Sequence, residues 1–115
     1  MDTEFFVSKS HRYSQARRFH RVPTDFIVHV RSDELRVNER ANDISEAGIG
    51  IVTPRPLAPM SLVSMRLELP HGMEPVELLG RVMWARDHMM GIRFEQTDSR
   101  VTDLVSRIRQ EIDRI

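Results

Sequence analysis

The chain has 115 residues, enough for one small domain with a single hydrophobic core. Its formal net charge is zero, because 17 lysines and arginines balance 17 aspartates and glutamates, and this excludes the broad positive surface of proteins that bind long nucleic acids. The absence of cysteine excludes disulfides and thiolate chemistry. No apolar run is long enough for a signal peptide or a membrane span, so we expect a cytoplasmic protein without membrane insertion.

The N-terminal residues show no regular periodicity, and we expect a mobile leader at 1–13 followed by one domain at 14–115. Six segments of that domain show strand patterns: about 26–30, 35–41, 48–52, 62–69, 76–86 and 90–94. Turn signals separate them, among them the proline-rich loop 53–59. Six short strands with such turns predict an all-β barrel or sandwich.

The C-terminal segment has a different period. Apolar residues recur there at helical spacing: Val101, Leu104, Val105, Ile108, Ile112 and Ile115. Asp98 or Ser99 can cap the start of such a helix. We therefore predict an amphipathic α-helix over 98–115 whose apolar face covers one opening of the barrel.

Two short motifs flank the first predicted strands. Arg17-Arg18-Phe19-His20-Arg21 contains the pattern RxxxR, and Asp43-Ile44-Ser45-Glu46-Ala47-Gly48 contains DxSxxG. An arginine fork donates two hydrogen bonds to a phosphate or to the O6/N7 edge of guanine. A carboxylate accepts from the N1 and N2 donors on the other guanine edge. The glycine permits a turn with positive φ or a close approach of two backbones.

In this order, the two motifs resemble the signature of the PilZ domain family, bacterial receptors for cyclic di-GMP. The resemblance covers about residues 14–115 and implies a six-stranded antiparallel β-barrel with a C-terminal helix. It implies a ligand site formed by Arg17, Arg18, Arg21, Asp43, Ser45 and Gly48. It also implies a receptor that signals by contact with another protein. Ala16 favours one ligand molecule per site, because an arginine there could stack on a second nucleotide.

The segment Gly80-Arg81-Val82-Met83-Trp84 is similar to a G-x-V-x-W strand that is frequent in the family. This similarity implies that Trp84 can stack on a guanine of the ligand, since base stacking on an aromatic ring contributes about 1–3 kcal/mol. The alternative is a tryptophan in the core or at the barrel rim. The sequence leaves both positions open.

A second RxxxR occurs at Arg36-Val37-Asn38-Glu39-Arg40. Its arginines fall at even spacing along a predicted strand, which places them on one face of that strand. We expect this face to be solvated and unconnected with the ligand.

Two other functions fit parts of the pattern. A PilZ-fold adaptor would contact proteins without binding nucleotide, and a small RNA-binding barrel would use the arginines of the first motif. Both motifs are complete, which disfavours the adaptor, and the neutral charge disfavours the RNA-binding protein. We expect no enzyme and no cofactor, because the chain lacks HExxH, GxSxG, P-loop and Rossmann motifs.

Overall fold

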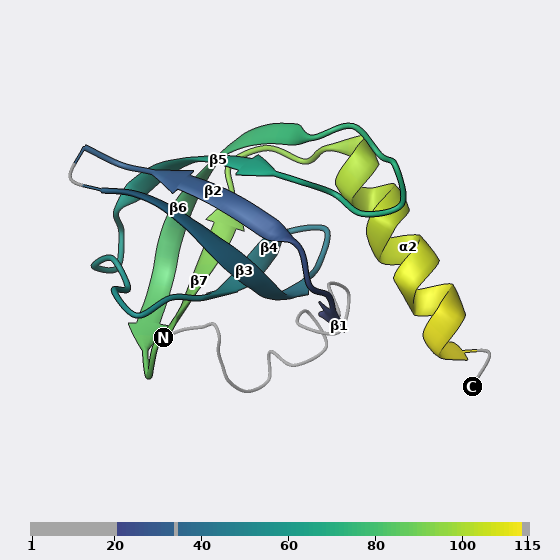
Figure 1. Ribbon diagram of the computed structural model, residues 1–115, viewed down its shortest axis with the longest axis horizontal. Helices are drawn as coiled ribbons and strands as arrows, with labels where there is room; N and C mark the ends of the chain where they lie inside the picture. Colours follow the sequence, from purple (N-terminus) through teal and green to yellow (C-terminus); the bar gives the residue numbers. More distant parts are fainter. Residues whose placement is uncertain (1–20, 34, 114–115) are drawn as a thin grey trace.

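Six antiparallel strands close into a barrel in the computed structural model, which describes residues 21–33 and 35–113 (Figure 1). The barrel strands are β2 (Ile27–Arg31), β3 (Arg36–Ile44), β4 (Gly48–Val52), β5 (Leu62–Leu67), β6 (Val76–Arg86) and β7 (Met89–Phe94). Their order around the ring is β3-β2-β5-β6-β7-β4, and the pairing of β3 with β4 closes it. The predicted six-stranded barrel is thus confirmed. The predicted leader and the arginines Arg17 and Arg18 lie outside the described residues.

The barrel encloses the hydrophobic core. Strand residues alternate between this core and the outer face. In β5, Val63, Met65 and Leu67 are buried, whereas Leu62 and Arg66 are exposed. Strand β4 is buried along most of its length, and its outward-facing Gly50 is covered by the Asp43 side chain of the neighbouring strand β3.

Strand β3 is longer than predicted and carries the second motif into the sheet. It continues to Ile44, so Asp43 lies in a strand instead of following one. A β-bulge between Ala41 and Asp43 shifts its register with β4. Bulges re-aim side chains and increase local twist, which the alternating pattern of a sequence does not predict. The short strand β1 (Val22–Pro23) pairs with this end of β3, with Val22 opposite Ile44 and Pro23 opposite Asp43.

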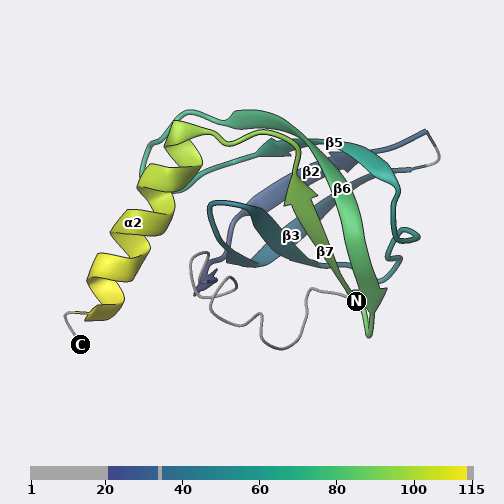
Figure 2. The same cartoon turned by 180° about the vertical axis from the view of Figure 1, so that it is seen from behind.

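The C-terminal helix α2 (Ser99–Asp113) is confirmed within the predicted range 98–115, of which 114 and 115 are not described. Val101, Leu104 and Val105 are buried in the core, and Ile108 packs against it. Ile112, which shares the apolar spacing, is 43% exposed, so the apolar face of the helix is not covered at this turn. The helix passes beyond the barrel, as both views of the ribbon show (Figure 1, Figure 2).

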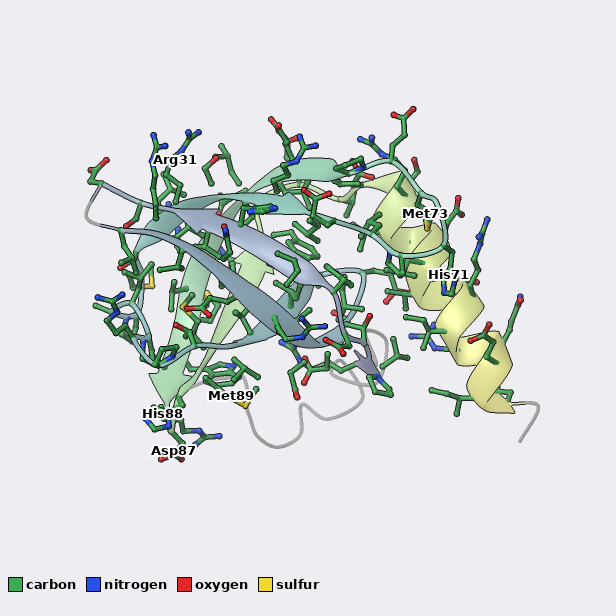
Figure 3. All side chains as sticks on the ribbon, in the orientation of Figure 1. Arg31, His71, Met73, Asp87, His88 and Met89 are labelled. Atoms are coloured by element: carbon green, nitrogen blue, oxygen red, sulfur yellow. The ribbon has the colours of Figure 1, made fainter. Side chains whose placement is uncertain are left out.

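The hairpin between β6 and β7 turns within two residues, Asp87 and His88, which point away from the barrel (Figure 3). Both have positive φ, 51° and 63°, as a two-residue hairpin of type I′ requires. The tight turn fixes the register of β6 against β7, with Arg86 opposite Met89. It therefore also fixes which residue of β7 lies opposite Trp84.

Candidate functional site

An ion pair joins the two sequence motifs. Arg21 Nη1 donates to Asp43 Oδ1 at 2.7 Å, although the two residues lie 22 positions apart in sequence. The pairing of β1 with β3 brings them together, and the buried Val22 anchors β1 next to Arg21. The side chains of Arg21 and Asp43 remain 41% and 27% exposed, so both are accessible to a ligand.

Asp43 has a second donor on its other oxygen. Asn42 Nδ2 lies 3.2 Å from Asp43 Oδ2. A carboxylate offers about four acceptor positions, so further donors can still bind it. Asn42 did not emerge from the sequence as a site residue, because its contribution depends on the bulge that directs it.

The DxSxxG motif forms a closed turn between β3 and β4. Ser45 Oγ accepts hydrogen bonds from the amides of Ala47, at 3.1 Å, and Gly48, at 3.2 Å. The Ser45 amide in turn donates to the Gly48 carbonyl at 2.8 Å. Ser45 is only 3% exposed, so its hydroxyl holds the turn together in this structure. The predicted contact of Ser45 with a ligand stays a prediction.

Gly48 lets two strands approach closely. A Cβ atom added at Gly48 would lie 2.5 Å from the carbonyl oxygen of Ile92 in β7. Its φ is not positive, since Gly72 is the described glycine with that conformation. Of the two roles that the sequence allowed for Gly48, the structure thus supports the close approach.

One row of paired residues crosses four strands on the outer face of the barrel: Asp43 in β3, Gly50 in β4, Gly91 in β7 and Trp84 in β6. The two glycines in the middle are covered from the two ends of the row. A Cβ atom on Gly50 would lie 2.7 Å from Asp43 Oδ1, and one on Gly91 would overlap the Trp84 indole. Asp43 and Trp84 therefore lie over the glycines from opposite sides and approach each other.

Trp84 belongs to the outer face of the barrel and not to its core. It is partly exposed and its indole lies against Gly91, next to the β-bulge between Val82 and Trp84. The Arg86 guanidinium carbon lies 5.5 Å from the centroid of the Trp84 ring. A cation over an aromatic face is favourable and restricts the orientation of the ring. The sequence did not single out Gly91 or Arg86, because their roles depend on register.

The turn also contacts the C-terminal helix. Arg109 Nη1 of α2 lies 3.5 Å from Glu46 Oε2, and Glu46 is the variable residue after Ser45 in the motif. The Glu46 side chain is 22% exposed. This ion pair connects the site to the helix that packs against the core.

The two arginines of the second RxxxR lie in different environments. Arg40 donates from Nε to Asp25 Oδ1 at 2.7 Å, and this hydrogen bond lowers the pKa of Asp25 below its usual value. Arg36 lies at the far end of β3, next to the β2–β3 turn. Among the described residues, neither forms an ion pair or hydrogen bond with Asp43, and the expectation that this motif lies outside the ligand site stays a prediction.

The family model of the PilZ domain matches residues 15–112, almost the whole chain. The chain belongs to the PilZ domain family. PilZ domains are receptors for cyclic di-GMP, and they often contact protein partners. No curated protein matches the chain significantly.

Three solved structures, one of them a PilZ domain by name, share the fold. The PilZ domain of CeSA from a cellulose-synthesizing bacterium has 20% identity and a TM-score of 0.59, over 82% of this chain and 98% of that one. The inhibitor of motility MotI/DgrA of Bacillus subtilis has 16% identity and a TM-score of 0.67, over 84% of this chain and 51% of that one. An uncharacterized Legionella protein has 18% identity and a TM-score of 0.54, over 82% and 98%. At these identities the similarity establishes the fold alone.

No helix in the described residues, 21–33 and 35–113, is long and apolar enough to cross a membrane. Within the same residues, no three histidine, aspartate or glutamate side chains are grouped as a metal site requires.

Proposed function

We propose that this PilZ domain binds cyclic di-GMP at the Arg21–Asp43 site and passes the signal to a protein partner by surface contact. Arg17, Arg18 and Arg21 would bind phosphates and guanine edges, and Asp43 would accept from guanine N1 and N2. The proposal assigns the protein no catalytic step. It places the protein in the cytoplasm, where cyclic di-GMP is made.

The observation that carries the proposal is the 2.7 Å contact between Arg21 and Asp43. It brings a cation of a type suited to phosphate and a carboxylate of a type suited to guanine to one point of the surface. Arg21 uses one of its five N–H groups for this contact, so the remaining donors can bind a phosphate or a base edge. Asp43 holds two donors and retains acceptor positions.

The row from Asp43 to Trp84 supports a ligand with two bases. The row crosses three strand spacings, so the Cα atoms of Asp43 and Trp84 lie about 14 Å apart. Both side chains extend toward each other along the outer face, over the two glycines. One guanine could bind Asp43 while the indole offers a stacking surface to the other. With Ala16 before the first motif, we propose one cyclic di-GMP per site.

Titration calorimetry with cyclic di-GMP tests the proposal. We expect a dissociation constant of about 1 μM or lower, which corresponds to about −8 kcal/mol. GTP, GMP and cyclic AMP should not compete, because none of them combines two guanines with two bridging phosphates. Absence of heat at high ligand concentration would overturn the receptor function and favour the nucleotide-free adaptor.

A further inference from the structure

A concave surface lies on the outer face of the barrel, across β2, β3, β5 and β6, away from the Arg21–Asp43 site. Its volume is about 480 Å³. Val30 and Met65 line it but are buried toward the core, so their backbone forms the floor of the groove. The residues next to Val30 and Met65 along each strand face outward, because strand residues alternate between faces. Their side chains form the two walls of the groove. The groove is centred at the β2–β3 hairpin end, roughly 20 Å along β3 from Asp43.

One wall of the groove is electrically compensated. His29 contacts Asn38 Oδ1 through Nδ1 at 2.6 Å and Glu68 Oε2 through Nε2 at 3.0 Å. Arg66 donates to the same Glu68 oxygen at 3.0 Å and to Glu77 Oε2 at 3.3 Å. Cations and carboxylates on this wall therefore satisfy each other.

The opposite wall carries two arginines without an ion-pair partner in the described part of the chain. Arg31 and Arg36 lie directly opposite each other in the register of β2 and β3, and Ser64 lies opposite Arg31 on β5. Arg31 points away from the barrel near the end of β2 (Figure 3). Neither arginine makes an ion pair or side-chain hydrogen bond with any other residue in the ranges 21–33 and 35–113. Like charges directly opposite each other destabilise a sheet, so an anion bound here would relieve a repulsion.

Arg31 and Arg36 differ in their ion-pair partners from Arg21 and from the other arginines on the barrel strands. Most of those arginines have a carboxylate partner within 4 Å: Arg21, Arg40, Arg66, Arg81 and Arg93. Arg86 instead lies over the Trp84 ring. The two arginines on these strands that lack such a partner among residues 21–33 and 35–113 are thus next to each other in one groove.

Exposed leucines continue the positively charged wall. Leu79 of β6 lies opposite Ser64 and is 53% exposed, and Leu62 lies one outward position further along β5 and is 51% exposed. The row from Arg36 to Leu79 crosses three strand spacings, about 14 Å. An extended peptide of about four residues has that length. Positive charge and apolar surface together fit a polypeptide better than a small inorganic anion. The row from Arg36 to Leu79 contains no aromatic residue on which nucleic acid bases could stack.

We propose that a partner protein docks in this groove through an acidic segment that also carries a large apolar side chain. Its carboxylates bind the forks of Arg31 and Arg36, and its apolar side chain packs on Leu79 and Leu62. The inference rests on the proposed function in one respect, since it names the surface by which the receptor contacts its partner. It assigns to Arg36 a role separate from cyclic di-GMP binding.

Selection from a random-sequence peptide display library tests the proposal, with the intact protein as bait. The selected peptides should be enriched in aspartate or glutamate together with leucine, isoleucine or phenylalanine. In fluorescence anisotropy, the double substitution Arg31→Glu/Arg36→Glu should weaken their binding by about tenfold or more, and Leu79→Ser should also weaken it. Raised salt should weaken binding to the wild type.

Arg55→Glu/Arg107→Glu is the matched control, because it changes the net charge equally at two exposed positions outside the groove. It should leave peptide affinity within about twofold. Circular dichroism should show that all variants are folded. Failure to select peptides, peptides without acidic enrichment, or equal affinity for Arg31→Glu/Arg36→Glu would overturn the proposal. Self-association of the wild type that these substitutions abolish would also overturn it, in favour of a second copy as the occupant.

Cyclic di-GMP titration of the same variants separates this inference from the proposed function. Arg31→Glu/Arg36→Glu should bind cyclic di-GMP like the wild type. A wild type that binds selected acidic peptides but no cyclic di-GMP would refute the receptor and leave the docking surface standing. A wild type that binds cyclic di-GMP but no acidic peptides would refute the docking surface and leave the receptor function standing.

Discussion

Gly50 lies directly beneath the carboxylate of Asp43, so that a Cβ atom at Gly50 would lie 2.7 Å from Asp43 Oδ1. Real Cβ atoms do not come this close to an oxygen, so Gly50→Ala must shift the Asp43 carboxylate, and we expect this shift to weaken its contact with Arg21. We expect cyclic di-GMP affinity to fall by about tenfold, since a charged hydrogen bond is worth about 1.5–3 kcal/mol. Calorimetry measures the loss.

A double-mutant cycle is the control for this prediction. In an Asp43→Ala background, Gly50→Ala should cause little further loss, because residues that act through one contact are not additive. Equal losses in both backgrounds would show that Gly50 acts independently of Asp43.

The ion pair between the motifs gives the second prediction. Arg21→Ala and Asp43→Ala should each reduce cyclic di-GMP affinity by about 30-fold or more, because removing one partner of a charged pair costs about 2–5 kcal/mol. Arg36→Ala and Arg40→Ala should leave it within about threefold, since exposed strand charges contribute little. If Arg36→Ala abolished binding and Arg21→Ala did not, the site would be assigned to the wrong RxxxR.

Trp84 is the sole tryptophan of the chain, so its fluorescence reports on the site. Cyclic di-GMP should change the emission of the wild type. Trp84→Ala should weaken binding by about 5- to 150-fold, corresponding to about 1–3 kcal/mol of stacking, and Trp84→Phe should retain part of the affinity. Full affinity of a folded Trp84→Ala protein would assign the indole a purely structural role over Gly91.

The helix should contribute to stability in proportion to burial. Leu104 is 0% exposed, and Leu104→Ala should lower the free energy of unfolding by about 2–5 kcal/mol. Ile108→Ala should cost less, because Ile108 is half-buried. Ile112→Ala is the control and should change stability by less than about 0.5 kcal/mol. Urea unfolding measures all three, and an unstable Ile112→Ala protein would mean that the last turn of α2 is covered.

Asp98 caps α2 and should make stability depend on pH. Its Oδ1 accepts from the Arg100 amide at 2.8 Å, and the Arg100 guanidinium holds the pKa of Asp98 below the usual value of 3.8. A carboxyl with a lowered folded pKa stabilises the protein above its unfolded pKa, and this contribution disappears as the pH falls through the folded pKa.

Asp98→Ala should therefore destabilise the protein at pH 7 by about 0.5–2 kcal/mol. The difference in melting temperature from the wild type should shrink as the pH falls below 3.8. Asp103→Ala, at an exposed position in the same helix, is the control for loss of a charge. A difference that stays constant down to pH 2 would contradict an ionised cap.

The pattern of the sequence predicted the barrel and the helix, because alternation and helical spacing follow directly from which residues must be buried. It also placed Arg21 and Asp43 in one site, through the family resemblance. The row from Asp43 to Trp84 could not be predicted, because it depends on the register of strands distant in sequence and on two bulges. The turn-forming bonds of Ser45 were missed for a related reason, since a serine hydroxyl can bind a ligand or a neighbouring amide equally well.

The closure of the barrel restricts how any partner can be recognised. Each strand from β2 to β7 pairs with two neighbours, so most of its backbone donors and acceptors are used within the ring. Short stretches, such as residues 36–39 of β3, pair with one strand alone. A partner peptide therefore finds little free edge on these strands at which to add a strand to the sheet, a common mode of peptide binding. Recognition falls instead to side chains that project from the outer face, where a single substitution can change the choice of partner.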